Sequence, residues 1–333
     1  MKRKVQLFLV IIFGLLIVGC GNNNEKDVIK NLTKKIEESK GYHLVGELEM
    51  LNNDDVYKYE VDVSYEYEDK FRVSLKNKIN NHEQIILKNE DGVYVLTPSL
   101  NKSFKFQSEW PYNNSQSYLL QTLLLDIKND KEREFAANDN GYVITTNVNY
   151  TSNKNLVKQN IYLDKDINIK EVHVLDKDNK VMIKMKFNEI DLKATHSKNL
   201  FALKNNMETA VIEEEVEVVS KIQDVIYPMY MPENTKLTNQ DRITKENGER
   251  IISTFSGDKS FILVQETAVR EEEMVTIPVI GEPLILTGTV AAFSDSSITW
   301  TRDGIDYYLI AEGMDEEEMV NIAKSISVMP VGK

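Results

Sequence analysis

Segments in which apolar and polar residues alternate place the strongest constraint on how this 333-residue chain can fold. The alternation begins near Tyr42. It is clearest in a row of apolar residues that charged or hydroxyl side chains separate: Tyr57, Tyr59, Val61, Val63, Tyr65 and Tyr67. A period of two puts every second side chain on one face of a strand, so this row predicts a strand with one buried face. We interpret its aromatic residues as core rather than as a platform for a ligand.

Further alternating segments follow between residues 71 and 190. They cover residues 71–75, 85–87, 93–97, 103–106, 142–150, 156–163, 169–175 and 181–190. Turn-forming pairs such as Asp91-Gly92 and Asn140-Gly141 separate several of them, as tight connections between antiparallel strands require. The pattern predicts a long antiparallel meander.

Two stretches of this region have helical spacing instead. Val28, Leu32 and Ile36 recur at helical intervals after Glu25, and Gly41 follows as a stop. A second apolar stripe runs from Tyr118 to Ile127 inside the segment 117–128. A helix of this kind can plug the concave side of a curved sheet.

The alternation decays after residue 204, and a second unit opens at residue 226. Pro228 and Pro232 exclude a helix there. Strands are predicted at 250–255, 260–265, 284–293, 297–302 and 305–310, followed by a closing helix with an apolar face that includes Met319 and Ile322. We therefore expect a mainly β protein with helices (α+β). Its parts are a curved half-barrel domain over 25–204, a linker over 205–225 and a smaller α+β domain over 226–333.

The N-terminus has the features of a lipoprotein export signal. Lys2, Arg3 and Lys4 precede an apolar run over residues 5–18, which is too short for a helix that spans a bilayer. The tetrapeptide Ile17-Val18-Gly19-Cys20 that follows resembles a bacterial lipobox. We expect cleavage of residues 1–19, acylation of Cys20 with palmitate-type chains, and a short tether over 20–24. The protein would then be anchored to the outer face of the cytoplasmic membrane.

The sequence lacks the patterns of several function classes. A net charge of −13 argues against a nucleic-acid partner. His82-Glu83 begins like a zinc-protease helix, but Ile86 stands where the second imidazole is needed. The other histidines are isolated in sequence, and Cys20 is the single cysteine. We predict no catalytic residue, no metal site and no cofactor.

Three stretches carry a resemblance to known families. With its lipobox, first helix, meander and plugging helix, the region 25–204 resembles the LolA-like fold, and the segment 67–73 is similar to a strand of that family. The stretch from Ser108 to Leu120 resembles the clostridial germination lipoproteins of the GerS family. The region from 226 onward, with Tyr227-Pro228-Met229-Tyr230-Met231-Pro232, is similar to the small domain of YdcC-type lipoproteins, which shorter GerS proteins lack.

This resemblance implies a non-enzymatic helper in spore cortex modification and germination. GerS-type proteins bind and activate a zinc-dependent cortex N-acetylmuramoyl-L-alanine amidase of the CwlD type on the forespore membrane. Trp110, Tyr112 and Tyr118 are the candidate partner-binding residues, because exposed Trp and Tyr dominate interface hot spots. The alternative for Trp110 is packing beneath the helix. Alternative functions are a carrier of a lipid or lipoprotein acyl chain in the half-barrel, and an RseB-like envelope-stress sensor.

Replacement of Cys20 by Ala should release the protein from the membrane pellet, because the acyl chains are expected to supply the membrane affinity. Cell fractionation with intact-mass measurement tests this expectation. A Cys20→Ala protein that stays in the pellet with the wild-type mass would show that an uncleaved apolar segment holds it instead.

Overall fold

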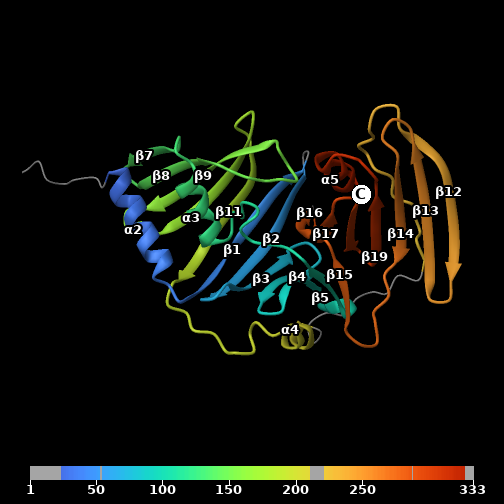
Figure 1. Cartoon of the computed structure of the whole chain (residues 1–333), viewed down its shortest axis with the longest axis horizontal. Coiled ribbons are helices and arrows are strands. Elements are labelled where there is room, and N and C mark those ends of the chain that lie inside the picture. The colour runs from blue at the N-terminus through green and yellow to red at the C-terminus, as the bar shows by residue number, and fades with distance from the viewer. Residues whose placement is uncertain (1–23, 53–54, 211–220, 287, 327–333) are drawn as a thin grey trace, which may run out of the picture.

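The computed structural model describes residues 24–52, 55–210, 221–286 and 288–326 (Figure 1). The predicted signal segment, Cys20 and residues 21–23 of the tether lie outside the described residues. In the described part the chain is mainly β, with two sheets and a small number of helices.

Within the described residues, the larger sheet has twelve strands and an open order, because it starts at β15 and ends at β7 without closing. In spatial order its strands are β15 (Val275–Val279), β6 (Lys102–Phe106), β5 (Gly92–Thr97), β4 (Glu83–Asn89), β3 (Lys70–Asn77), β2 (Asp55–Glu66), β1 (Gly41–Asn52), β11 (Val181–Asp191), β10 (Ile169–Asp176), β9 (Leu156–Asp164), β8 (Gly141–Asn147) and β7 (Glu134–Asn138). The predicted curved antiparallel sheet is confirmed for the strands of the first unit, and β15 adds to its edge in parallel. A short 3-10 helix, η1 (Pro98–Leu100), joins β5 to β6.

The alternating row in β2 is core, as the sequence indicated. Tyr59, Val61, Val63 and Tyr65 are buried, whereas Tyr67 lies beyond the end of the strand and is 66% exposed. Tyr65 stacks on Tyr42 of the neighbouring β1, with ring centroids 5.0 Å apart. These rings fill the interior on this face of the sheet instead of lining an open surface.

Two helices cover the inner face of the sheet around β1 and β8–β11 (Figure 1). The first is α2 (Glu25–Glu37), which begins where the side chain of Asn24 accepts a hydrogen bond from the backbone N–H of Asp27. The second is α3 (Leu120–Asn129), the predicted plugging helix. Apolar residues of both helices belong to the same core as the strands.

The smaller sheet contains seven strands in the part of the chain that is described. Their order is β12 (Lys236–Lys245), β13 (Gly248–Ser256), β14 (Phe261–Thr267), β19 (Ile305–Ile310), β18 (Ser297–Arg302), β17 (Thr289–Ser294) and β16 (Glu282–Leu286). The closing helix is α5 (Glu316–Ser325), whose Met319 and Ile322 are fully buried.

The prediction of a single strand over 284–293 is wrong. The segment forms a hairpin in which Leu286 of β16 pairs with Thr289 of β17. Gly288 has a φ of +89°, which residues with a side chain rarely adopt, and so it permits the tight turn. Three strands that the sequence pattern did not reveal are β7, β12 and β15, and all of them lie at a sheet edge.

The second unit contributes directly to the first sheet and its core. β15 pairs in parallel with β6, from Val275 opposite Lys102 to Val279 opposite Phe106. Val290 and Ala292 of β17 are buried in the core of the larger sheet. The two sheets are therefore joined by main-chain hydrogen bonds and by a shared apolar interior.

Polar contacts reinforce this junction. The hydroxyl of buried Tyr59 accepts a hydrogen bond from the Gly288 N–H at 2.5 Å and donates to the Leu286 carbonyl at 3.3 Å. Lys102 Nζ lies 2.7 Å from Asp306 Oδ2, and both side chains are almost completely buried. A charge removed from water in this way is costly unless an opposite charge lies close to it. The pair therefore favours the arrangement in which β6 lies against β19.

The segment predicted as a linker, 205–225, starts inside a helix. This helix is α4 (Leu203–Ala210), and Met207 packs with Phe201 against Ile85 and Leu96 on the outer face of the sheet. Residues 211–220 lie outside the described part, and the domain boundary itself stays a prediction.

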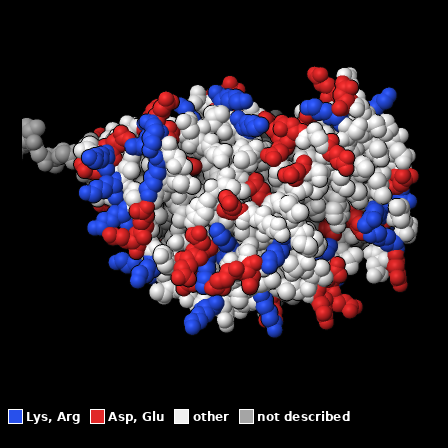
Figure 2. Space-filling model, viewed as in Figure 1, with Lys and Arg blue, Asp and Glu red and all other residues white. Residues whose placement is uncertain are grey.

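Charged side chains are unevenly distributed on the face shown in Figure 2. Lys, Arg, Asp and Glu intermingle most densely over the α2 end, whereas the middle of this face has larger uncharged areas between scattered charged side chains. The α2 end is also where the chain enters the folded part after the predicted tether (Figure 1).

Cleavage within the predicted linker should leave two fragments that stay associated, because β15 and Val290 belong to the structure of the first unit. A specific protease site inserted between residues 215 and 216 allows the cut, and size-exclusion chromatography under native conditions measures the result. Separate elution of the fragments would show that each sheet folds and persists independently.

Candidate functional site

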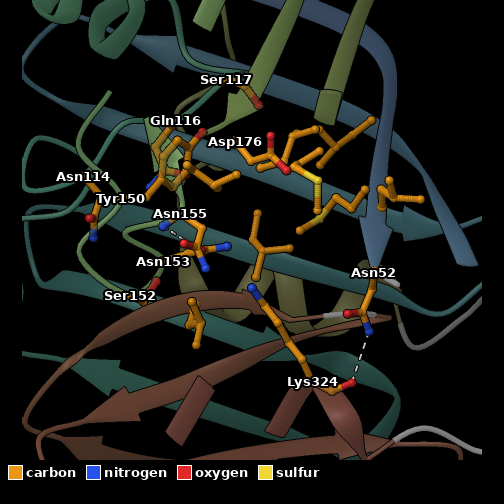
Figure 3. A pocket seen from close by; sticks show the side chains of 18 of the residues that line it. Asn52, Asn114, Gln116, Ser117, Tyr150, Ser152, Asn153, Asn155, Asp176 and Lys324 are labelled. Atoms are coloured by element: carbon orange, nitrogen blue, oxygen red, sulfur yellow. Dashed lines mark hydrogen bonds between the residues drawn. The ribbon is translucent and has the colours of Figure 1, made fainter. Parts of the chain in front are cut away.

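A cavity of about 590 Å³ lies where the two sheets meet (Figure 3). This volume is in the range of pockets that bind small molecules. Its lining comes from β1, β4, β9 and β11, from the loop before α3, the β8–β9 loop and the β10–β11 turn of the first unit, and from β16 and α5 of the second unit. No single segment of the sequence supplies more than a small part of the lining residues.

One wall of the cavity is apolar and consists of strand residues. Leu48 and Met50 of β1 lie beside Met182 and Ile183 of β11, and Met50 pairs with Ile183 across the two strands. Ile86 of β4 adds to this wall. Leu48 and Met50 lie on the same face of β1 because they are alternate residues, and Ile183 shares that face as the partner of Met50.

The facing wall is rich in amide and hydroxyl groups. It consists of Asn114, Gln116 and Ser117 from the loop before α3, together with the segment 152–155 between β8 and β9. Figure 3 shows Gln116 and Asn153 on the same side of the space, away from Asn52 of β1. The cavity is thus apolar on one side and polar on the other.

Glu282 of β16 ties the amide wall to the second unit. Its carboxylate accepts hydrogen bonds from the side-chain amides of Asn113 and Asn114, the latter at 2.9 Å. Asn114 in turn accepts two hydrogen bonds from Thr151, one from its backbone N–H and one from its hydroxyl, each at 3.0 Å. Both loops are thereby fastened to β16.

Lys324 extends from α5 into the cavity between Asn153 and Asn52 (Figure 3). Burial lowers the pKa of its ammonium group to about 8, although the charge of Glu317 opposes this shift. The backbone carbonyl of Lys324 accepts a hydrogen bond from the Asn52 side chain at 3.1 Å. Within the described residues the ammonium group itself has no ion-pair or hydrogen-bond partner.

Asp126 of α3 is held by the loop that leads to the amide wall. Ser115 donates a hydrogen bond to Asp126 Oδ1 at 3.0 Å, and Gln159 donates to Oδ2 at 2.8 Å. Burial nevertheless raises the pKa of Asp126 to about 6, since two hydrogen bonds offset only part of the lost hydration. Burial also raises the pKa of Tyr118 and Tyr150, which both line the cavity.

The three aromatic residues predicted to bind a partner lie in different surroundings. Trp110 is 1% exposed and meets Phe71 edge-on at 5.8 Å between ring centroids, as the packing alternative required. Tyr118 is 2% exposed, and its hydroxyl has no partner within the described part of the chain. Tyr112 alone is on the surface, so Trp110 and Tyr118 do not form an exposed contact patch with it.

Tyr112 belongs to a small surface cluster with residues near the β2–β3 turn. Its hydroxyl donates to Asp69 Oδ1 at 2.6 Å, and Lys88 Nζ lies 5.2 Å from the centre of its ring. Lys88 Nζ is also 3.8 Å from Asp69 Oδ2. The exposed ring of Tyr67 precedes this turn.

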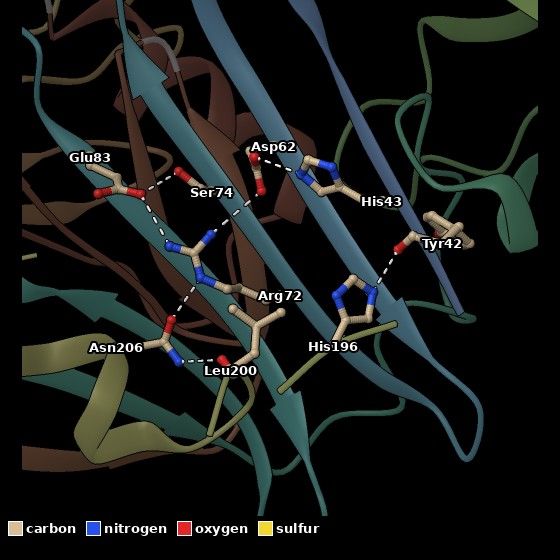
Figure 4. A network of polar contacts seen from close by, with 9 residues as sticks. All are labelled: Tyr42, His43, Asp62, Arg72, Ser74, Glu83, His196, Leu200 and Asn206. Carbon is tan, nitrogen blue, oxygen red and sulfur yellow. Dashed lines mark hydrogen bonds and ion pairs between the residues drawn. The ribbon is translucent and has the colours of Figure 1, made fainter. Parts of the chain in front are cut away.

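A polar network on the outer face of the sheet includes a histidine that is isolated in sequence (Figure 4). Arg72 forms ion pairs with Asp62 and Glu83 and donates to Asn206 of α4 at 2.7 Å. His43 Nε2 lies 2.9 Å from Asp62 Oδ2. The network attaches α4 to β1–β4. Among the described residues, no group of three or more His, Cys, Asp or Glu side chains is arranged to hold a metal ion.

Comparison with known proteins identifies the family. No protein-family model matches the sequence. The sequence is 37% identical to the sporulation protein YdcC of Bacillus subtilis strain 168 over 334 residues, which cover 98% of each chain. The chain belongs to the YdcC family. The match to YdcC extends over both sheets.

Solved structures are similar to this YdcC-family chain at lower identity. The Pseudomonas aeruginosa MucA/MucB complex matches with 12% identity and a TM-score of 0.32, covering 88% of this chain and 97% of that chain. The Clostridioides difficile complex of the CwlD amidase with the GerS lipoprotein matches with 18% identity and a TM-score of 0.31, covering 51% and 96%. A LolA superfamily protein from Nitrosomonas europaea matches with 8% identity and a TM-score of 0.31, covering 55% and 99%.

Sequence reasoning did not find the cavity of this YdcC-family member. Its polar wall contains Asn, Gln and Ser residues in loops, where such residues are common for reasons of turn geometry alone. Lys324 stands in the last turn of α5, where a cation favours the helix dipole, so its position in the sequence does not single it out. Its placement depends on how α5 meets β1, which no local pattern shows.

The raised pKa of Asp126 predicts a specific pH dependence of stability. The folded protein keeps this proton up to about pH 6, whereas the unfolded chain loses it near pH 4, so stability falls as pH rises through that window. Asp126→Asn should remove this loss, and relative to wild type it should gain up to about 3 kcal/mol between pH 4 and pH 7. Denaturant unfolding at both pH values measures the difference.

Asp139→Asn provides the matched control, because Asp139 is an exposed turn residue. It should follow the wild-type pH profile. If Asp126→Asn and Asp139→Asn change stability by the same amount at each pH, the buried carboxyl does not keep its proton.

Proposed function

We propose that this chain is an exported, non-enzymatic lipoprotein that takes part in spore formation. It is anchored through Cys20 to the outer face of the cytoplasmic membrane of the forespore. There it binds a zinc-dependent cortex N-acetylmuramoyl-L-alanine amidase of the CwlD type and activates it, which leads to muramic-δ-lactam in the cortex and to competence for germination.

The family relationship supports a role in spore formation. YdcC of Bacillus subtilis is a sporulation protein, and the similarity extends over nearly the whole of both chains. The lipobox-like Ile17-Val18-Gly19-Cys20 after a short apolar run supports the anchor. In the part of the chain that is described, no helix is long and apolar enough to cross a membrane.

The observation that carries the amidase proposal is the contact between Tyr112 and Asp69. Each residue belongs to a stretch of sequence that carries a family resemblance, 108–120 for the GerS-type proteins and 67–73 for the LolA-like proteins. The 2.6 Å hydrogen bond brings these stretches together at one surface. A surface site formed by two such stretches is suited to contact with a protein.

The chemistry of this surface suits a protein interface. Tyr67 and Tyr112 present two exposed rings, 66% and 38% accessible, and Tyr side chains are enriched among interface hot spots. Lys88 and Asp69 sit around the Tyr112 ring and supply the polar rim that stable interfaces have. We therefore place the amidase contact here.

A double variant, Tyr67→Ala with Tyr112→Ala, tests the proposal. Loss of two hot-spot rings should weaken amidase binding by at least tenfold, because each costs about 1 kcal/mol or more. Pull-down and activity assays with purified amidase measure binding and activation. Mass spectrometry of muropeptides from spores that carry the variant should show reduced muramic-δ-lactam.

Tyr227→Ala is the control, since Tyr227 is a similarly exposed tyrosine of the second unit. It should bind and activate the amidase like wild type, and all variants should keep the wild-type melting temperature. Normal lactam content in spores that lack the protein, or an amidase that is equally active alone, would refute the proposal.

A further inference from the structure

The cavity contains a positive charge that the structure leaves without a counter-ion. Lys324 Nζ points into it, half-buried, and has no ion-pair partner among the described residues. Transfer of an ammonium group out of water is costly unless an anion or several acceptors compensate. The position of Lys324 therefore points to an anionic group on whatever occupies the cavity.

The other charged groups of the lining do not serve as the counter-ion of Lys324. Glu282 is engaged by Asn113 and Asn114, and Asp176 accepts the backbone N–H groups of Asp178 and Lys180 in a turn. Asp178 and Lys177 are exposed at the rim. The remaining neighbours that can titrate are Tyr118, Tyr150 and, on the helix of Lys324 itself, Glu317.

The amide wall distinguishes between kinds of anion. Gln116 of this wall and Asn321, which lines the cavity from α5, make no side-chain hydrogen bond within the described part of the molecule. Asn153 uses only its side-chain oxygen, which accepts the Asn155 N–H at 3.2 Å. A hydrocarbon chain against this wall would leave buried amides without partners. Peptide groups offer one donor and one acceptor each, which matches side-chain amides.

The opposite wall is suited to an aliphatic side chain. Leu48, Met50 and Ile183 form a continuous apolar surface on two hydrogen-bonded strands. The buried hydroxyl of Tyr118, which also lines the cavity, has no partner in the described residues and can donate a further hydrogen bond. The Lys324 ammonium group, the side-chain amides and the apolar side chains of β1 and β11 thus surround one space.

We propose that the cavity binds the carboxyl-terminal end of a short peptide with an aliphatic last residue. The terminal carboxylate lies on Lys324, the peptide groups contact Gln116, Asn153 and Asn321, and the aliphatic side chain packs on the β1–β11 wall. This site is separate from the Tyr67–Tyr112 surface, so the proposal does not depend on an amidase partner.

Calorimetric titration of the full chain in phosphatidylcholine nanodiscs tests the proposal, with empty nanodiscs as baseline. The probes are N-acetyl-Ala-Ala-Leu as the free acid, the same peptide as the C-terminal amide, and octanoate, which has the carboxylate and an alkyl chain but no peptide group. The acid should bind at least about tenfold more tightly than the amide, since a charge-assisted hydrogen bond is lost in the latter. Octanoate should bind more weakly than the acid.

Variants assign the effect to residues. Lys324→Met should bind the acid as weakly as the amide, whereas Lys324→Arg should keep the preference for the acid. Lys177→Met, at the exposed rim, should change the affinity by less than about twofold. Gln116→Leu should weaken the acid peptide without weakening octanoate.

The dependence on pH gives an independent measurement. With a pKa of about 8, the Lys324 ammonium loses its proton at alkaline pH, so the wild-type preference for the acid should disappear by about pH 10 and persist in Lys324→Arg. Equal binding of acid and amide by wild type at pH 7 would overturn the proposal. Octanoate that binds more tightly than the peptide would overturn it in favour of an acyl ligand.

Discussion

The structure depends on burial of the inner face of a wide, open sheet. An open sheet with one apolar face is stable only when other elements cover that face. In this chain α2 and α3 cover the strands near β1 and β8–β11, while Val290 and Ala292 of the β16–β17 hairpin enter the same core from the second unit. The two parts of the chain therefore share one interior. This explains why β15 joins the first sheet although it belongs to the later sequence.

The cavity is a result of this arrangement. Between the part of the sheet that the helices cover and the part that the hairpin covers, the inner face is not filled by side chains, and the lining comes from both units. Glu282 closes this region with polar contacts to Asn113 and Asn114 rather than with apolar packing. A small change in how the second unit docks would alter the shape of the space directly, because its walls belong to different elements.

Local patterns revealed much of the fold and little of the site. The alternation in β2 and the helical stripe of α3 identified both elements, because each buries one face and the period of the buried residues is visible in sequence. β12 was not found because every one of its residues is exposed, so no apolar period marks it. Trp110 and Tyr118 looked like contact residues by type, yet burial depends on long-range packing against Phe71 and α3. The lining of the cavity could not be predicted for the same reason, because Lys324 and Met50 line one space only through the docking of α5 against β1.

The position of β1 in the middle of the larger sheet has a consequence for how the chain folds. β1 pairs with β2 on one side as soon as a hairpin can form, but its other edge pairs with β11, near the far end of the first unit. Until residues 181–191 are available, that edge exposes unpaired backbone groups, which can pair with strands of other molecules. Closing such a long loop is entropically costly and makes folding slow. In a chain made N-terminus first, the central seam of the sheet closes only after residues 181–191 have been made, and during that interval the free edge of β1 is open to misassembly.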